Sequence, residues 1–320
     1  MFAPFSTLAT RIKEGLAVKV AHAATQPPNS SAETLSFFWV DVFALRPREG
    51  NQLAVFLDGN GLDTDTMQAI AREMAISETT FLQTPEHGGN AKVRIFTTTR
   101  ELPFAGHPTL GTAYVVAETQ GLNDKVVLEM GVGDIPVALD RSDGGLKLEM
   151  TQRDPEFGPI VTDRATVARA IGRTEEDLEP DLPVQVVNTG LPFVIVPLKS
   201  LDVIKNTRLQ PQVKEEIPEI ADLGLYMFCQ ETVNADATIH ARPASAGRED
   251  PATGSAAGCL VSYIVEHGVA QPGSDVVIEQ GVWVLRNGRL FTRADKVDGR
   301  VQNVRVGGQV FVALKGELAL

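Results

Sequence analysis

Three titratable side chains of this sequence stand at predicted element boundaries: Glu78 before a strand, and His107 and Asp250 at helix starts. Glu78 lies between a predicted helix and a β-rich strand, flanked by Ile76 and Phe81, and partial burial there would raise its pKa towards neutrality. A carboxyl group with such a pKa works as both base and acid. The alternative for Glu78 is a solvated loop glutamate, and for His107 a hydrogen bond to nearby backbone.

Small residues and proline mark the starts of two predicted apolar helices. The first start reads Gly106-His107-Pro108-Thr109, and the second reads Asp250-Pro251-Ala252-Thr253-Gly254-Ser255. Such starts leave the free amides of the first turn accessible, and the positive end of the helix dipole favours an anion there. If the two halves of the chain face each other, both starts converge on one carboxylate-binding site. The alternative is plain capping, with Asp250 as the N-cap before Pro251.

Hydrophobic periodicity and turn signals predict the elements that position these residues. The predicted strands are 35–45, 53–57, 79–82, 92–98, 126–128, 135–138, 146–151, 185–188, 193–197 and 237–242. One amphipathic helix is expected to start at an Asp65 cap, with Gln68 completing a capping box, and to end near Ala75. The other predicted helices are 106–118 (followed by a Gly121 cap), the polar segment 163–178, and 253–266.

The second half of the chain repeats the plan of the first half. Placing Thr109-Leu110-Gly111 over Ala256-Ala257-Gly258 also places Gly121 over Gly268 without a gap. An internal duplication of a strand-helix unit is the economical interpretation, although two matched glycines can arise by chance. A mixed sheet around one buried helix in each half would explain why both helices are apolar almost all round.

The bulk composition favours a folded protein with a small-molecule substrate. The chain has 320 residues, of which 43% are hydrophobic, enough for one or two packed cores. A net charge of -12 argues against nucleic acid and anionic membranes as partners. No apolar run approaches the roughly 20 residues that a membrane-spanning helix requires.

The cysteine and histidine content points away from disulfides and metals. Only Cys229 and Cys259 occur, so we expect no disulfide framework and an intracellular, cytoplasmic protein. The five histidines are scattered without zinc-binding spacing, and no metal is expected. Residues 1–35 are either a targeting segment or a loosely attached extension; the extension is favoured because basic residues interrupt the apolar stretch instead of preceding it.

Five segments in the same order and spacing resemble the PhzF-like family of phenazine-biosynthesis proteins. They are Gly50-Asn51-Gln52-Leu53-Ala54-Val55-Phe56, the helix 67–74, Ser77-Glu78-Thr79-Thr80-Phe81, the run 101–113 through Gly106-His107-Pro108, and Asp250-Pro251-Ala252-Thr253-Gly254-Ser255-Ala256-Ala257. The resemblance covers about residue 36 to the C-terminus. It implies an α+β fold of the diaminopimelate epimerase type, with two pseudo-symmetric lobes, each a mixed sheet or barrel around a central helix. The expected lobes are 36–131, joined by about 307–320, and 132–306.

The resemblance also implies the roles of the site residues. Glu78 is the expected acid/base of an isomerase, with His107 and Asp250 as polar partners in proton handling. The expected substrate-binding residues are Gly106, Thr109, Gly254 and Ser255, the Ser255 hydroxyl lying near a substrate carboxylate. No organic cofactor is implied, and the family commonly forms homodimers.

Two departures and two alternatives limit this interpretation. Neither helix start carries the thiol that two-base racemases of this architecture use, and Cys259 lies deeper in its helix, where a buried, inert thiol is expected. Residues 282–289 differ from the family pattern, which leaves the substrate open. A carboxylate-binding protein without chemistry is the alternative from another class, although retention of Glu78, His107 and Asp250 favours the enzyme. A dehydratase or epimerase of another substrate is the second alternative.

Overall fold

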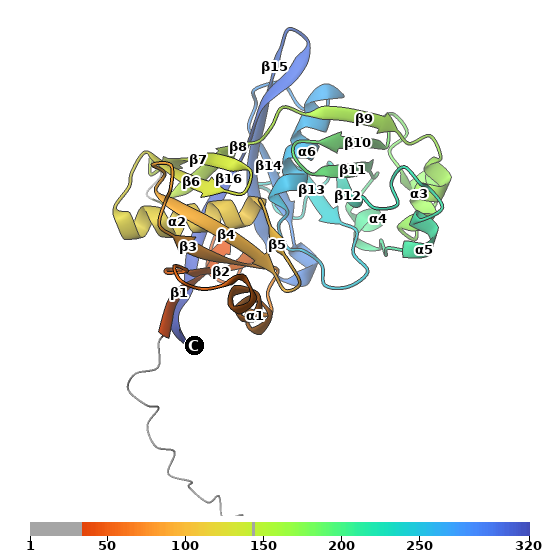
Figure 1. Ribbon diagram of the computed structural model, residues 1–320. Helices are drawn as coiled ribbons and strands as arrows, with labels where there is room; N and C mark the ends of the chain where they lie inside the picture. Colours follow the sequence, from red (N-terminus) through yellow and green to blue (C-terminus); the bar gives the residue numbers. More distant parts are fainter. Residues whose placement is uncertain (1–33, 143–144) are drawn as a thin grey trace, which may run out of the picture. The chain divides into compact units, whose positions relative to one another are not determined.

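Short β-strands separated by a few helices give this chain a mixed α+β fold (Figure 1). The structure, a computed structural model, describes residues 34–142 and 145–320, so the prediction for residues 1–35 falls outside the described residues except at its last two positions. The strands are β1 Thr34–Val42, β2 Asn51–Phe56, β3 Glu78–Gln83, β4 Ala91–Thr97, β5 Glu101–Leu102, β6 Lys125–Met130, β7 Gly133–Asp140, β8 Lys147–Thr151, β9 Glu156–Ile160, β10 Gln185–Asn188, β11 Pro192–Pro197, β12 Gly224–Cys229, β13 Ile239–Pro243, β14 Val276–Gln280, β15 Gly288–Val297 and β16 Arg300–Ala319. The helices are α1 Thr64–Met74, α2 Gly106–Gln120, α3 Arg164–Ala170, α4 Leu201–Lys205, α5 Pro211–Lys214 and α6 Gly254–Glu266, with 3-10 turns η1 Glu175–Asp177 and η2 Val282–Val284.

A closed barrel encloses helix α2. Among the described residues, eight strands follow one another in the order β1-β2-β3-β4-β6-β7-β8-β16, and β1 also pairs with β16, which closes the ring. The parallel pairs β2–β3 and β4–β6 are connected through α1 and α2, as parallel neighbours require a crossover. Val40, Leu53 and Val55 of the strands pack in one core with Leu110 of α2.

The second half repeats this order of pairing around helix α6. Strands β11–β12 and β13–β14 are parallel, like β2–β3 and β4–β6 in the first half. The pair between them, β12–β13, is antiparallel, like β3–β4 in the first half. Gly121 and Gly268 follow their helices with φ of 68° and 73°, left-handed values that favour glycine. The predicted duplication and the diaminopimelate epimerase-like fold class are thus confirmed. The strands β7 and β8 continue the ladder from β6 to β16, across the lobe boundary expected at residue 131.

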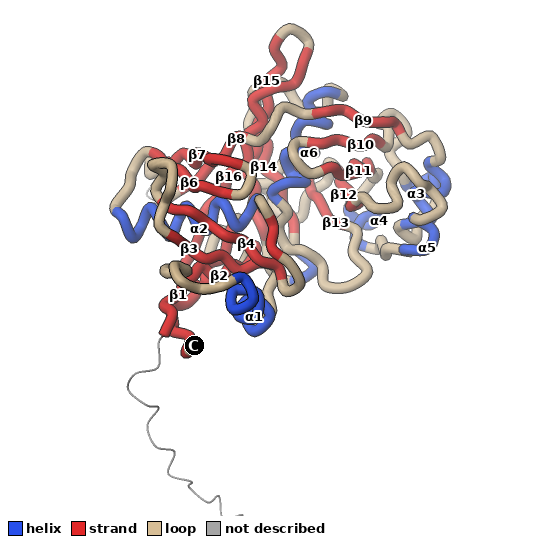
Figure 2. The backbone as a smooth tube through the Cα atoms, in the orientation of Figure 1, coloured by secondary structure: helices blue, strands red, loops and turns tan. Residues whose placement is uncertain are grey.

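Both central helices are buried because apolar residues surround their axes. Figure 2 shows how few helical segments, drawn in blue, lie among the red strands. Side chains of α2 and α6 belong to the same hydrophobic core, and Leu35–Leu318 form one compact unit. Within 34–142 and 145–320, no helix is long and apolar enough to cross a membrane.

Two helix predictions were wrong in detail. Helix α1 has Asp63, not Asp65, as its N-cap, because the Asp63 carboxylate accepts the Thr66 N–H at 2.7 Å. Gln68 makes no capping box; it donates to the Thr97 carbonyl at 2.8 Å. The predicted polar helix 163–178 ends at Ala170, because Gly172 takes a left-handed φ of 69° and the chain resumes only as the 3-10 turn η1.

Candidate active site

The first turns of the two central helices meet. A Cβ atom added to Gly106, at the start of α2, would lie 3.3 Å from the backbone nitrogen of Ser255 and 3.6 Å from the carbonyl carbon of Gly254. The N-caps are Ala105 and Thr253, and neither makes a side-chain capping hydrogen bond among the described residues. Both dipoles therefore direct their positive ends, with amides that no capping side chain occupies, towards one region.

Glu78 faces the start of α2 from the first position of β3. The left-handed residue Ala75 ends α1, and the chain turns directly into β3, which places the Glu78 carboxyl on the same face as Thr80 and the helix. Its Oε2 atom lies 3.4 Å from Nε2 of His107, with side-chain exposures of 17% and 8%. Neither atom has a hydrogen-bond partner within the described chain. Buried polar atoms left unpaired in this way are typical of a functional site.

Burial shifts the pKa values of Glu78, His107 and Asp250 away from the ordinary values of these side chains. Loss of solvation, with the nearby Asp250 charge adding to it, raises the pKa of Glu78 to about 8. Burial lowers the pKa of His107 to about 3, against a smaller opposing effect of a hydrogen bond to the Gln52 backbone. Burial also raises the pKa of Asp250 to about 6, although hydrogen bonds from Thr253 and Asn51 oppose the rise. Near pH 7 the imidazole is therefore neutral and the Glu78 carboxyl exchanges protons readily.

Asn51 joins the two halves of the site. Its side-chain nitrogen donates to Asp250 Oδ1 at 2.6 Å and to the Ala252 carbonyl at 3.0 Å, and lies 3.2 Å from Nδ1 of His107. The Ala252 carbonyl can only accept, which fixes the orientation of the amide. The amide nitrogen carries two hydrogens, which its two shorter contacts with oxygen use. A hydrogen bond shared with Nδ1 of His107 would place the proton of the neutral ring on Nε2, the atom that faces Glu78.

A second set of hydrogen bonds fixes Asp250 from its own lobe. The Thr253 hydroxyl donates to Asp250 Oδ2 at 2.6 Å, and the buried Gln280 amide donates to the Asp250 carbonyl at 2.8 Å and to the Thr253 hydroxyl oxygen at 3.0 Å. The alternative in which Asp250 caps the second helix was therefore wrong: Thr253 occupies that position, because the helix begins only at Gly254, and Pro251 lies outside its first turn.

Sequence reasoning missed Asn51, Thr253 and Gln280 as members of this group. Asn51 stood in the Gly50-Asn51 turn, and Gln280 followed Glu279 in a β-rich segment. The usable signal was a polar amide inside an otherwise apolar run, since buried amides of this kind need partners.

Thr109 and Ser255, two further predicted site residues, differ in whether their hydroxyl groups are already hydrogen-bonded. Thr109 is fully buried, and both its hydroxyl and its N–H donate to the Ala105 carbonyl, at 2.7 and 3.2 Å. Ser255 is half-buried, its backbone nitrogen lies beside Gly106, and its hydroxyl has no hydrogen bond to the described residues. Of the two hydroxyls, only that of Ser255 is available to a ligand.

The two thiols lie outside this group. Burial raises the pKa of Cys229 to about 12 and that of Cys259 to about 11, and Cys259 contacts the Thr189 hydroxyl at 3.4 Å. Thiols with such pKa values are weak nucleophiles and bases at neutral pH. Across the described parts of the chain, no three His, Cys, Asp or Glu side chains converge as metal ligands.

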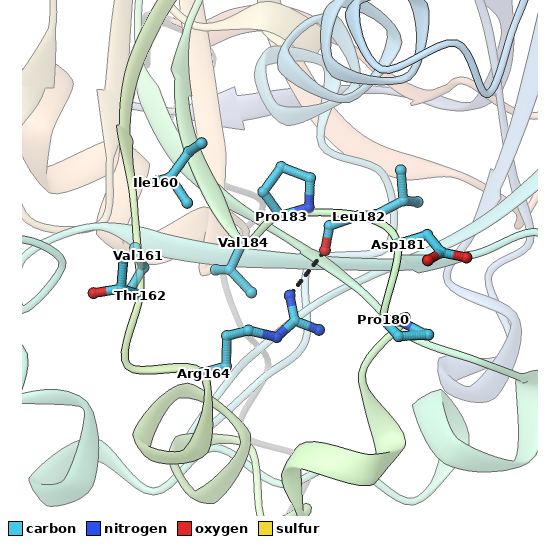
Figure 3. A pocket seen from close by; sticks show the side chains of 9 residues that line it. All are labelled: Ile160, Val161, Thr162, Arg164, Pro180, Asp181, Leu182, Pro183 and Val184. Atoms are coloured by element: carbon cyan, nitrogen blue, oxygen red, sulfur yellow. Dashed lines mark hydrogen bonds between the residues drawn. The ribbon is translucent and has the colours of Figure 1, made fainter.

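The surface also carries a pocket away from these residues. It has a volume of about 380 Å³ and is lined by 160–162, Arg164 and 180–184 (Figure 3). The Arg164 guanidinium donates to the carbonyls of Leu182 and Glu179, both at 2.8 Å, so its hydrogen bonds hold the pocket wall itself. None of the predicted site residues lines this pocket.

Comparisons with known proteins relate the chain to one family. Residues 40–316 match the model of the phenazine biosynthesis-like protein family. The chain is 36% identical over 275 residues to trans-2,3-dihydro-3-hydroxyanthranilate isomerase of Pseudomonas aeruginosa, covering 84% of this chain and 94% of that protein. It is 34% identical over 299 residues to an uncharacterized isomerase of Mesorhizobium japonicum, covering 89% and 99%.

Solved structures show the same fold over the whole described core. A phenazine biosynthesis protein of the PhzF family from Bacillus anthracis superposes with a TM-score of 0.82 at 27% identity, covering 90% of this chain and 100% of that chain. A predicted epimerase from Pseudomonas aeruginosa superposes with a TM-score of 0.76 at 34% identity, covering 89% and 99%. With this fold, these relatives and two helix starts meeting at a buried carboxyl group, the chain belongs to the phenazine biosynthesis-like, or PhzF, family and is an isomerase.

Proposed function

We propose that this isomerase moves a proton between two carbons of a small carboxylated metabolite, with Glu78 as the acid/base and without a cofactor. The observation that carries the proposal is the buried, unpaired contact between Glu78 Oε2 and His107 Nε2 at 3.4 Å. A carboxyl group with a pKa of about 8 beside a neutral imidazole suits abstraction of a proton from one carbon and delivery of a solvent-exchangeable proton to another.

The proposed reaction uses only groups of the chain. The ionised Glu78 carboxylate takes a proton from a C–H bond next to an electron-withdrawing group, and the electron pair of that bond spreads into an enolate-like system. The free amides at the starts of α2 and α6 and the Nε2–H of neutral His107 stabilise the developing negative charge. The protonated Glu78 exchanges its proton with solvent and then protonates the second carbon, so that substrate and product have the same composition.

The related Pseudomonas enzymes act on trans-2,3-dihydro-3-hydroxyanthranilate, and we propose a substrate of that class, a small ring that carries a carboxylate. The helix starts, with Gly106 and Gly254 leaving room for close approach and the Ser255 hydroxyl beside them, are the proposed carboxylate-binding groups. Thr109 has a structural part in this arrangement, because its donors are bound to Ala105.

The test is incorporation of solvent deuterium into trans-2,3-dihydro-3-hydroxyanthranilate, followed by mass spectrometry. Wild-type protein is expected to add one mass unit per exchanged proton, and Glu78→Gln to lose the exchange while keeping the fold. Glu118→Gln is the matched control, because that carboxylate pairs with Arg141 at the surface. Full exchange by Glu78→Gln would end the proposal. Binding without any exchange by wild type would favour the carboxylate-binding protein, and loss of water from the substrate would favour a dehydratase.

Three further parts of this proposal concern the whole protein. We propose a homodimer, a cytoplasmic location, and a division into lobes 36–131 (with about 307–320) and 132–306. Light scattering on the purified chain tests the first, cell fractionation the second, and limited proteolysis at the proposed boundary the third.

A further inference from the structure

Arg286 reaches from the second half of the chain to the turn that precedes Asn51. Its Nε donates to the Gly50 carbonyl at 2.8 Å, and its Nη2 donates to the Glu49 carbonyl at 2.9 Å and to Asp41 Oδ1 at 2.5 Å. The second oxygen of the buried Asp41 accepts the Arg48 N–H at 2.6 Å. One guanidinium and one carboxylate therefore fix both sides of this turn.

These contacts bear directly on the backbone of Asn51. The Gly50 carbonyl belongs to the same planar peptide group as the Asn51 N–H, so its hydrogen bond to Arg286 sets the direction in which Asn51 leaves the turn. The Gly50 N–H donates to the Asn287 carbonyl at 3.2 Å, so both polar groups of Gly50 are bound by neighbouring residues of one segment. Gly50 itself takes a left-handed φ of 59°.

The same segment also borders the chain next to Asp250. A Cβ atom added to Gly281 would lie 2.5 Å from the Pro251 carbonyl oxygen, and one added to Gly288 would lie 3.1 Å from it. The Arg286 N–H donates to the Gly281 carbonyl at 3.1 Å, which ties the arginine to that contact. Residues 281–288 therefore contact the chain next to both ends of the Asn51–Asp250 hydrogen bond, and they include all but the last residue of the stretch 282–289 that departs from the family pattern.

We propose that Arg286, with Asp41, is a positioning pair for Asn51, and through it for His107 and Asp250. The pair holds the Asn51 amide where it donates to Asp250 and keeps the proton of His107 on Nε2. This inference rests on the proposed function for its effect on catalysis, but not for its effect on the His107 ring. A shift of about 1 Å at Asn51 is enough to break contacts of 2.6 and 3.2 Å.

A merely structural role for Arg286 predicts something different. An arginine that only connects the two halves by hydrogen bonds contributes to stability. Its loss would leave the tautomer of His107 and the ratio of kcat to KM unchanged. Arg164 offers the matched control: it also donates to two backbone carbonyls, and its side chain is 20% exposed against 19% for Arg286. Arg164 contacts none of the proposed active-site residues.

The first experiment compares ¹⁵N–¹H correlations of the histidine rings in wild type, Arg286→Met and Arg164→Met, with His107 assigned by its loss in His107→Gln. Wild type and Arg164→Met are expected to show the proton of His107 on Nε2 alone. Arg286→Met is expected to show a mixture of both tautomers. An unchanged Nε2–H signal in folded Arg286→Met would overturn the proposal.

The second experiment measures turnover of trans-2,3-dihydro-3-hydroxyanthranilate. Arg286→Met is expected to lower kcat by about 10- to 100-fold with KM within about 3-fold, and Arg286→Lys to recover part of the loss because it retains a cationic donor. Asp41→Asn keeps the shape of the Asp41 side chain but removes the charge that pairs with Arg286. It replaces Arg286→Met, with the same expected loss of kcat, if that variant does not fold. An equal loss in Arg164→Met would contradict the inference. If wild type does not turn over this compound, the proposed function is in error, and the ring spectra alone decide the role of Arg286.

Discussion

The side-chain nitrogen of Asn51 lies 2.6 Å from Oδ1 of Asp250, although 199 positions separate the two residues. This hydrogen bond crosses between the halves of the chain and ends at the carboxylate whose charge adds to the effect of burial in raising the pKa of Glu78. Its donor is also 3.2 Å from His107. One neutral amide thus links Asp250 and His107, and its hydrogen bond opposes the burial that raises the pKa of Asp250.

Replacing that amide tests the coupling. Asn51→Leu keeps the approximate volume but removes the donor, leaving Asp250 Oδ1, the Ala252 carbonyl and His107 Nδ1 without this partner. We expect turnover to fall by about 100-fold and the free energy of unfolding to fall by about 1–3 kcal/mol. Kinetics and urea denaturation measure the two effects. Wild-type turnover in a folded Asn51→Leu protein would remove Asn51 from the site.

The raised pKa of Glu78 predicts a pH-dependent stability. The folded carboxyl group keeps its proton up to about pH 8, whereas the unfolded one ionises near its ordinary value of 4.5. Between these values the folded state binds more protons, so its contribution to stability is full below pH 4.5 and is lost as the pH rises towards 8. Glu78→Gln should remove this loss, so that its free energy of unfolding at pH 8 exceeds that of wild type by on the order of 3 kcal/mol.

Denaturation midpoints of the two proteins at pH 4.5, 6 and 8 check this. His107 has a lowered pKa and acts in the opposite sense, gaining stability as the pH rises from about 3 to 6.5, so the comparison uses the difference between Glu78→Gln and wild type. A difference that stays constant with pH would show that the Glu78 carboxyl is solvated in the folded protein.

The same pKa predicts the pH dependence of catalysis. If the ionised Glu78 is the base, kcat/KM should rise about tenfold per pH unit below pH 8 and level off above it. His107 adds no step in this range because its pKa of about 3 keeps it neutral. Initial rates from pH 5.5 to 9.5 measure the profile, and a profile that is flat across pH 8 would argue against Glu78 as base.

Gly50 should not tolerate a side chain. Its left-handed φ of 59° disfavours other residues, and an added Cβ would lie 2.1 Å from the Val42 carbonyl oxygen. Gly50→Ala should destabilise the protein by more than about 2 kcal/mol and disturb the Asn51 turn. Gly61→Ala is the control, because its φ of 78° is also left-handed but no atom lies within 4 Å of the added Cβ; it should cost only about 1 kcal/mol. Thermal unfolding distinguishes the two.

The thiols should be dispensable for chemistry. Cys259 is buried in α6, and its pKa of about 11 leaves almost no thiolate at neutral pH. Cys259→Ala should therefore keep kcat within a few-fold while losing about 1–2 kcal/mol of stability from the small cavity. Abolished exchange in a folded Cys259→Ala protein would instead indicate a thiol base, as in the racemases of this architecture.

The sequence alone predicted much of the framework. Helices α2 and α6 were predictable because their residues are apolar on all sides and their ends carry glycine, which are properties of short segments. Glu78, His107 and Asp250 were nominated because they stand in motifs whose order and spacing are visible in one dimension. The fold class followed from the same motifs and from the repeat.

What the tertiary structure decided is which of these residues meet and what state they adopt. Asp250 became a partner of Asn51 instead of a helix cap because the closed strand order brings the turn at Gly50 against the second helix start. Asn51, Gln280 and Arg286 gave no strong local signal, since a polar residue in a turn or strand end is satisfied equally well by water. Only burial against a distant segment gives such residues fixed partners, and only burial moves the pKa of Glu78 away from that of an ordinary carboxyl group.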